Sequence, residues 1–157
     1  MPEFSHVNEQ GLAMMVDVSE KKISLRKAVA QSIVVLPEEV LNTLIAGDKQ
    51  TKKGPVFQTA IIAGIMAAKK TGELIPLCHP LGLDNCKIEI QINSNELMIE
   101  CTATITSKTG VEMEALTGAS IAALTVYDMC KALSHDIVIK EIKLIEKTGG
   151  KNDFKRT

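Results

Sequence analysis

The chain has 157 residues, of which 45% are hydrophobic and 24% are charged, and its formal net charge is −1. This composition excludes a disordered chain and gives no overall attraction to nucleic acid or to a membrane surface. Aromatic residues make up only 3% of the chain, too few for the stacking platforms of a single-strand nucleic-acid binder. The length fits one domain, residues 1–157, in which we expect residues 1–15 to be loose.

The four cysteines lack a C-x-x-C pair, so the sequence does not support a zinc knuckle. The N-terminus has no apolar core of a signal peptide, and no apolar run is long enough to span a membrane. We therefore expect a cytoplasmic protein whose thiols are reduced and mostly buried.

The first half of the chain predicts one strand and two helices. Alternating side chains at residues 26–35 indicate a strand, and Pro37 opens a short helix that ends near Ala46. A basic loop follows at residues 48–55, and apolar residues at helical spacing then predict a helix over residues 56–70.

The second half predicts a hairpin, a long helix and a last strand. Two alternating runs, 86–92 and 97–105, are joined by Asn93-Ser94-Asn95 and form an antiparallel hairpin. Residues 111–133 read as one helix rich in Ala and Leu, and residues 137–145 as a strand. The order β-α-α-β-β-α-β predicts an α+β sandwich with helices on one face of a mainly antiparallel sheet. Exposed sheet edges favour oligomerisation.

The tripeptide Lys-Thr-Gly occurs at residues 70–72, 108–110 and 147–149. The three copies lie in different contexts, so they are not a structural repeat. Together with Ser24-Leu25-Arg26-Lys27 the last copy matches two parts of the penicillin-binding signature, but S-D-N is absent and the serine lies in a predicted strand. That function is therefore not supported.

Each copy has its own local interpretation. At residues 70–72 we expect a helix end capped by Gly72. At residues 108–110 we expect a turn that begins a helix, with Glu112 and Glu114 complementing its dipole. At Lys147 two readings stay open: a phosphate site made by the lysine and the backbone N–H groups of Gly149 and Gly150, or a solvated strand end.

The end of the long helix carries an acid and a base, Asp128 and Lys131, three residues apart. They are neighbours on the helix surface, and a surface ion pair of little energy is one interpretation. The other is catalysis, because a lysine partly removed from water can have a lowered pKa and act as a general acid or base.

Two further segments are candidates for binding. Pro80 forces His79 into an extended backbone within an irregular apolar segment, where the histidine is either structural or functional. No further metal ligands lie near it in sequence. Lys52-Lys53-Gly54 precedes a helix and is either an anion site or a solvated basic loop.

Four longer motifs resemble the cyclic pyranopterin monophosphate synthase family (molybdenum cofactor biosynthesis protein C), and the resemblance runs from about Val16 to the C-terminus. The motifs are LIPLCHPL (74–81), KTGVEMEALT (108–117), LTVYDMCKA (124–132) and EKTGGK (146–151).

The resemblance implies a reaction and an assembly. The substrate is a cyclised dihydroguanosine triphosphate, and the products are cyclic pyranopterin monophosphate and pyrophosphate. The implied fold is a ferredoxin-like α+β sandwich, assembled as a hexamer of three dimers with pockets at a subunit interface. No cofactor is implied, assistance by Mg²⁺ stays open, and neither nucleic acid nor membrane is a partner.

The resemblance also assigns residues by position. It implies a catalytic acid and two essential lysines at Asp128, Lys131 and Lys147. Substrate-binding segments match Leu77, Cys78, His79, Met113 and Glu114, and further pocket residues match Arg26, Lys53 and Glu112. Members of the family often have Asp at the position of Pro55, which puts the geometry of the basic loop in doubt.

Helix geometry favours a site shared by two chains. Glu114 and Asp128 are 14 residues apart, which corresponds to about 21 Å along a helix. Two such helices packed antiparallel about a two-fold axis would bring Glu114 of one chain near Asp128 of the other.

Two other functions stay open: a guanine-nucleotide hydrolase, and a regulatory module that binds nucleotides without turnover.

Overall fold

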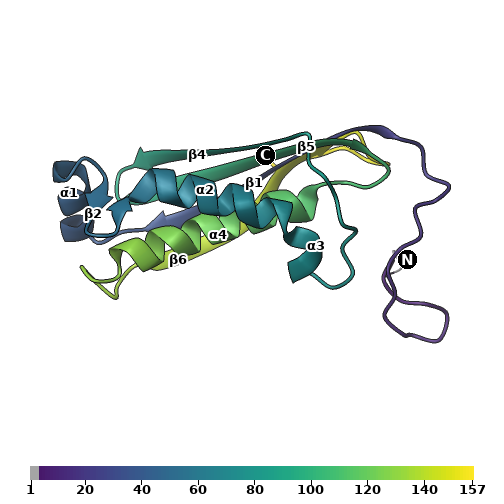
Figure 1. Ribbon diagram of the computed structural model, residues 1–157, viewed down its shortest axis with the longest axis horizontal. Coiled ribbons are helices and arrows are strands. Elements are labelled where there is room, and N and C mark those ends of the chain that lie inside the picture. The colour runs from purple at the N-terminus through teal and green to yellow at the C-terminus, as the bar shows by residue number, and fades with distance from the viewer. Residues whose placement is uncertain (1–3) are drawn as a thin grey trace.

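A five-stranded antiparallel sheet carries two long helices on one face in the computed structural model (Figure 1). The structure describes residues 4–157, the side chain of Gln50 excepted. The sheet order is β4-β5-β1-β6-β7, and β2 and β3 form a separate two-stranded hairpin. The elements are β1 (Ser24–Val35), α1 (Glu38–Ala46), β2 (Gln50–Thr51), β3 (Gly54–Pro55), α2 (Val56–Lys69), α3 (Thr71–Leu74), β4 (Asn85–Asn93), β5 (Glu96–Ser107), α4 (Glu112–Cys130), β6 (Val138–Thr148) and β7 (Phe154–Lys155).

The central strand β1 is lined with small side chains on the face that meets the helices. Ala28, Ala30, Ser32 and Val34 are fully buried there, and they alternate along the strand as a pleated backbone requires. The hydroxyl of Ser32 donates to the carbonyl of Ala119 in α4 at 2.9 Å. Small residues and this hydrogen bond allow α4 to lie close against the sheet.

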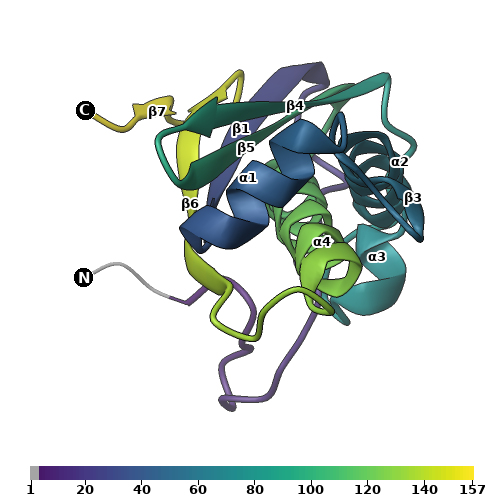
Figure 2. The same cartoon turned by 90° about the vertical axis from the view of Figure 1, so that its left-hand side faces the viewer.

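Helices α2 and α4 lie side by side on this face (Figures 1 and 2). They approach closely at two glycines, Gly64 and Gly118. A Cβ atom on Gly64 would lie 2.7 Å from the carbonyl oxygen of Gly118, and one on Gly118 would lie 2.6 Å from Cys101 Sγ. A side chain at either position therefore requires a neighbouring side chain or the other helix to shift. The crossing fixes α4 along the length of the molecule, so its two ends lie at opposite ends.

The predicted α+β class is confirmed: the sheet is antiparallel, and α2 and α4 pack on it. The hairpin predicted at residues 86–105 and the helix predicted at residues 56–70 are also confirmed. Two short pairings were not predicted, β2 with β3 inside the basic loop and β7 with β6.

The prediction that Gly72 ends the second helix is wrong. Lys70 is the residue that follows α2, and Gly72 lies inside α3. The buried hydroxyl of Thr71 donates to the carbonyl of Ala68 at 2.9 Å, so a side chain helps to satisfy a carbonyl at the end of α2. Gly72 has another role: a Cβ there would lie 3.0 Å from Pro80 Cα.

The segment before β1 lies at the end of the molecule where α4 begins (Figure 1). Residues 1–3, part of the stretch predicted to be loose, lie outside the described residues. Val7 and Ala13 pair in a small antiparallel bridge. No helix within residues 4–157 combines the length and the apolar character needed to cross a membrane.

We predict that Gly64→Ala lowers the free energy of unfolding by about 1–3 kcal/mol, because an added methyl overpacks the crossing of α2 and α4. This is opposite to the gain of about 1 kcal/mol that alanine brings to an unstrained helix position. Gly82→Ala is the matched control, since a Cβ there meets nothing within 4 Å. Urea unfolding of both variants tests the prediction, and equal stabilities would contradict it.

Candidate active site

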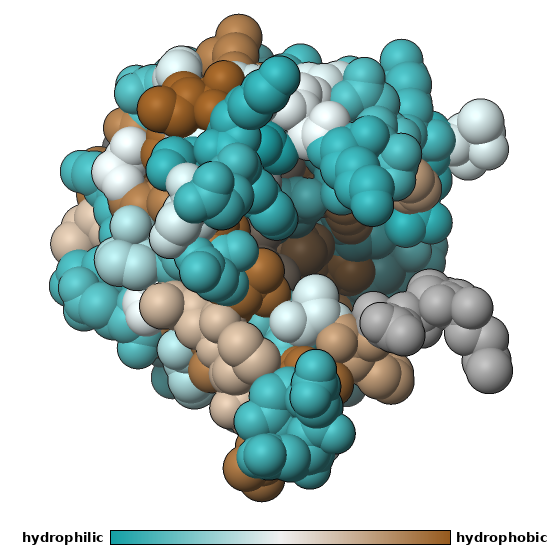
Figure 3. All heavy atoms as spheres, turned by 90° about the vertical axis from the view of Figure 1, so that its right-hand side faces the viewer, coloured by the Kyte–Doolittle hydropathy of each residue, from teal (hydrophilic) through white to brown (hydrophobic). Residues whose placement is uncertain are grey.

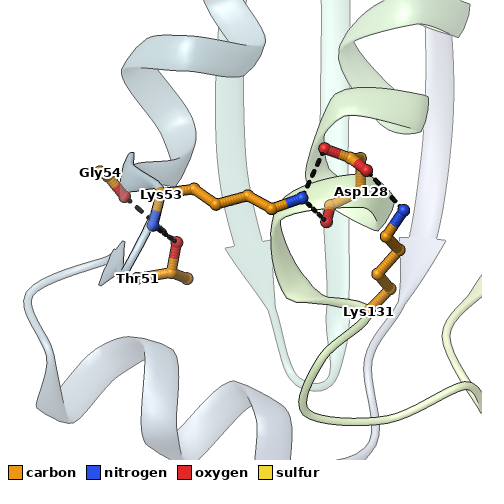
Figure 4. A network of polar contacts seen from close by, with 5 residues as sticks. All are labelled: Thr51, Lys53, Gly54, Asp128 and Lys131. Atoms are coloured by element: carbon orange, nitrogen blue, oxygen red, sulfur yellow. Dashed lines mark hydrogen bonds and ion pairs between the residues drawn. The ribbon is translucent and has the colours of Figure 1, made fainter.

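Three charged residues meet where α4 ends, and we call Lys53, Asp128 and Lys131 the Lys53 cluster (Figure 4). Lys53 Nζ lies 2.9 Å from Asp128 Oδ2 and donates to the carbonyl oxygen of Asp128 at 3.0 Å. Lys131 Nζ lies 2.8 Å from the other carboxylate oxygen, Oδ1. Asp128 therefore holds two lysines that come from separate parts of the chain.

The β2–β3 hairpin brings Lys53 to this position. The backbone N–H of Lys53 donates to Thr51 Oγ1 at 3.1 Å, and Thr51 pairs with Gly54 across the hairpin. Pro55, the departure from the family pattern, lies in β3 and directly precedes α2. Lys53 contacts Asp128 with this proline in place.

The electrostatics of the Lys53 cluster bear on the two interpretations of Asp128 and Lys131 that the sequence left open. The hydrogen bonds from Lys131 and then Lys53 lower the pKa of Asp128 to about 2. The same contact with Asp128 raises the pKa of Lys131, which in the single chain favours the surface ion pair over the alternative of a lowered pKa. The physical reason is exposure: the Lys131 side chain is 51% exposed, and water stabilises its charged form.

An apolar cleft of about 560 Å³ adjoins the Lys53 cluster. It is large enough for a bound small molecule. Residues from α1, the β2–β3 hairpin and the end of α4 line it: Thr43, Leu44, Thr51, Lys52, Lys53, Met129, Ala132 and Leu133.

The opposite end of α4 carries a cationic cleft of about 200 Å³. Lys147 Nζ lies 2.9 Å from Glu112 Oε1 in the first turn of α4. Arg26 donates from Nη2 to the carbonyl of Lys108 at 3.2 Å, and its buried Nε has no hydrogen-bond partner within residues 4–157. Among the described residues, one acidic side chain, Glu112, and five cationic ones line the cleft: Lys21, Arg26, Lys27, Lys147 and Lys151.

Sequence reasoning missed three of these cations, Lys21, Lys27 and Lys151. Lys21 and Lys27 flank the start of β1, and Lys151 follows β6. The sequence did contain a signal for them, since Lys21 and Lys27 lie near Arg26 and Lys151 lies near Lys147. Five cations around one small cleft favour a polyanion such as a triphosphate.

Gly149 has a conformational role, and its N–H is not free for the phosphate cradle that was one of the two readings left open at Lys147. Its N–H donates to Asp153 Oδ1 at 3.0 Å, so this donor already has a partner. Its carbonyl accepts from Ser24 Oγ at 2.7 Å. Gly149 has φ of +85°, and a Cβ there would collide with the carbonyl oxygen of Leu25. Glycine therefore lets β6 turn tightly against β1 beside Lys147.

The remaining predicted residues also lie at this end, near a second apolar cleft of about 540 Å³. Leu77, Cys78 and Met113 line it together with His6 and Ala13 of the N-terminal segment. Figure 3 looks onto this end and shows a hollow with apolar residues at its floor and hydrophilic side chains around it.

Burial affects two titratable groups at this end. Glu114 is only 3% exposed, and burial raises the pKa of its carboxyl. Burial likewise raises the pKa of the Cys78 thiol. His79 lies beside the cleft, with Nε2 at 2.7 Å from the carbonyl oxygen of Val16.

The predicted site residues thus form two groups in one chain. Lys53, Asp128 and Lys131 lie at one end of α4, and all the others lie at the other end. Glu112 and Asp128 are separated by 16 positions of α4, which is about 24 Å. Within residues 4–157 no three His, Cys, Asp or Glu side chains gather closely enough to hold a metal ion.

A profile described as the MoaC family matches residues 15–150. The chain belongs to the MoaC family. The MoaC match begins just before the segment that contacts His79 and ends after Gly149, so it includes both ends of α4.

Named relatives of this MoaC chain agree with the family. It is 53% identical over 151 residues to the cyclic pyranopterin monophosphate synthase of Xanthomonas campestris pv. campestris, covering 96% of this chain and 92% of that protein. It is 52% identical to the molybdenum cofactor biosynthesis bifunctional protein of Synechocystis sp., covering 98% of this chain and 46% of that protein. It is also 52% identical to molybdenum cofactor biosynthesis protein 1 of Dictyostelium discoideum, covering 96% of this chain and 27% of that protein. The chain thus spans less than half the length of the last two.

We predict that Asp128 remains mostly ionised at about pH 3, where an unperturbed aspartate is largely protonated. Its pKa is lowered in the folded chain, so its contribution to stability is present above the unfolded pKa of 3.8 and is lost as pH falls through about 2. Carbon NMR of the carboxyl group during an acid titration measures this. Lys53→Ala and Lys131→Ala should each move the midpoint upward, and a midpoint near 3.8 in the unmodified chain would contradict the prediction.

Proposed function

We propose that this chain is a cyclic pyranopterin monophosphate synthase. It converts (8S)-3',8-cyclo-7,8-dihydroguanosine 5'-triphosphate into cyclic pyranopterin monophosphate and pyrophosphate, as a lyase of molybdenum cofactor biosynthesis. The observation that supports this most strongly is the 53% identity, over 96% of the chain, with a protein of that name. The geometry suggests a chemical role for the cationic cleft and another for the Lys53 cluster.

The cationic cleft suits the phosphates of this substrate. Closing the cyclic phosphate requires a sugar hydroxyl to give up its proton to a base and attack the α-phosphorus. The bond between that phosphorus and the oxygen that bridges it to the β-phosphorus breaks at the same time. Pyrophosphate leaves with the electron pair, and preorganised cations stabilise the charge that develops on it. Arg26 and Lys147 are held for this role by the Lys108 carbonyl and by Glu112.

The Lys53 cluster suits the proton transfers. Opening the purine-derived ring and rebuilding it as a pterin moves protons to and from nitrogen and oxygen atoms. Asp128 raises the pKa of Lys131 above its already basic ordinary value, so Lys131 is protonated at neutral pH and can act as a proton donor. Asp128 remains an anion that orients both Lys53 and Lys131. Exclusion of water by a bound partner would raise the pKa of Asp128 and lower the pKa of Lys131, because removal from water disfavours the charged form of each group.

We further propose that each site is shared by two chains, as part of a homo-oligomer assembled from two-fold dimers, three of which form the implied hexamer. The separation of about 24 Å between the ends of α4 is too long for one small substrate. Antiparallel pairing of α4 helices would place the cationic cleft of one chain beside the Lys53 cluster of its partner. Large exposed apolar side chains on the outer surfaces of α2 and α4 support such a contact: Ile62, Met66 and Leu124 are 57%, 52% and 52% exposed.

We predict that the purified chain turns over the cyclised triphosphate, and that Lys131→Ala lowers the rate by about 10²–10⁴ because it removes a proton donor. Pterin fluorescence after oxidation of the product, with pyrophosphate release measured in parallel, provides the readout.

Lys140→Ala is the matched control for this prediction. Lys140 is also an exposed, ion-paired lysine, with Nζ 2.7 Å from Glu96 Oε1, but it lies outside the Lys53 cluster and the cationic cleft. The Lys140→Ala variant should therefore turn over the substrate at the normal rate. Near-normal turnover by Lys131→Ala would overturn its assignment. Phosphate or pyrophosphate release without a fluorescent pterin would instead indicate a nucleotide hydrolase.

A further inference from the structure

A short segment, Val16–Ser19, lies between His79 and Lys108, and we call it the strap. At one end of the strap, the carbonyl oxygen of Val16 lies 2.7 Å from His79 Nε2. At the other, the carbonyl oxygen of Ser19 accepts a hydrogen bond from Lys108 Nζ at 2.7 Å. Val16 and Val18 are half-buried, whereas Asp17 and Ser19 are exposed. The strap therefore contacts the body of the protein with alternate residues.

Asp17 determines the local shape of the strap. Its Oδ1 accepts hydrogen bonds from the backbone N–H of Ser19 at 2.8 Å and from the Ser19 hydroxyl at 2.6 Å. This is the turn that an aspartate forms with a backbone N–H two residues ahead. The N–H of Lys21 then donates to the carbonyl of Val18 at 3.0 Å, which begins the turn toward β1.

The contact with Val16 has a chemical consequence for the His79 ring. A carbonyl oxygen can only accept a hydrogen bond, so Nε2 of His79 must carry the proton. In the neutral ring Nδ1 then presents a lone pair, which can accept from an N–H or O–H group. Gly72 supports this arrangement from the other side, because it lets the backbone of residues 79–80 approach closely.

The contact with Lys108 links the strap to the cationic cleft. The carbonyl of Lys108 accepts from Arg26 Nη2 at 3.2 Å. Lys108 therefore contacts Ser19 through its side chain and Arg26 through its backbone carbonyl. Through these two contacts, one turn of the strap connects His79, beside the apolar cleft, with Arg26 in the cationic cleft.

We propose that Asp17 is a positioning residue: by shaping the strap, it fixes His79 with Nε2 protonated and Nδ1 available as an acceptor for an N–H or O–H group of the substrate. This inference rests on the proposed function for the identity of the substrate. The state of the histidine ring can be measured without turnover, so the two proposals can fail independently.

The experiment is nitrogen–proton NMR of the full chain with labelled histidine, without substrate, at a pH where imidazole is neutral. His79 is assigned as the signal that disappears in His79→Gln. In the unmodified chain we expect a visible Nε2–H proton on His79, protected from solvent exchange by its hydrogen bond. The exposed rings of His6 and His135 should show no such proton and serve as internal references.

Three variants decide the result. Asp17→Ala should lose the protected Nε2–H signal, whereas Asp17→Asn, which keeps the Oδ1 acceptor, should retain it. Glu20→Ala changes an exposed acid next to the strap and should leave the signal unchanged. Where turnover is established, Asp17→Ala should also lower kcat/KM by about 10- to 100-fold through misplacement of His79, with most of the loss restored in Asp17→Asn. A signal unaffected by Asp17→Ala, or lost equally in Asp17→Asn, would overturn the proposal.

Discussion

The close crossing of α2 and α4 at Gly64 and Gly118 is the constraint on which the rest of the structure depends. The helices can approach because neither glycine has a side chain and because small residues of β1 lie beneath α4. Close-packed interiors do not tolerate even one extra methyl group at such a contact. With its middle fixed, α4 extends along the sheet, and each end projects its charged residues into a separate cleft.

This arrangement divides the chemistry by charge. At one end, five cations around Glu112 form a cleft that favours a polyanion. At the other, Asp128 holds Lys53 and Lys131 in water-exposed ion pairs, and the contact with Asp128 raises the pKa of Lys131. Exposed ion pairs contribute little to stability, so their convergence from the β2–β3 hairpin and α4 is better explained by function than by folding. Neither end alone contains both the phosphate site and the proton donors that we propose for the reaction, and this separation is the reason for proposing a shared site.

Local patterns in the sequence predicted most of the fold and the identity of many site residues. The alternation of residues 86–105 specifies a hairpin because a pleated strand buries every second side chain. The contacts between site residues were not predictable in this way. Lys53 and Asp128 are 75 positions apart, and Val16 and His79 are 63 apart, so their meeting depends on how the elements pack. For the same reason the sequence left open a phosphate cradle that uses the Gly149 N–H, which Asp153 occupies. It also left open a lowered pKa for Lys131, which would require more burial than one chain provides.

The central claim, a site shared by two chains, is tested most directly by mixing inactive variants from opposite ends of α4. Lys147→Ala and Lys131→Ala are co-expressed so that subunits pair at random. In a hybrid dimer one pocket then carries both lesions and the other carries neither, so roughly a quarter of all pockets should regain activity. Mixing Lys53→Ala with Lys131→Ala is the control, since lesions in the same cluster leave no pocket intact. Activity that stays at the level of the single variants in both mixtures would contradict the shared site.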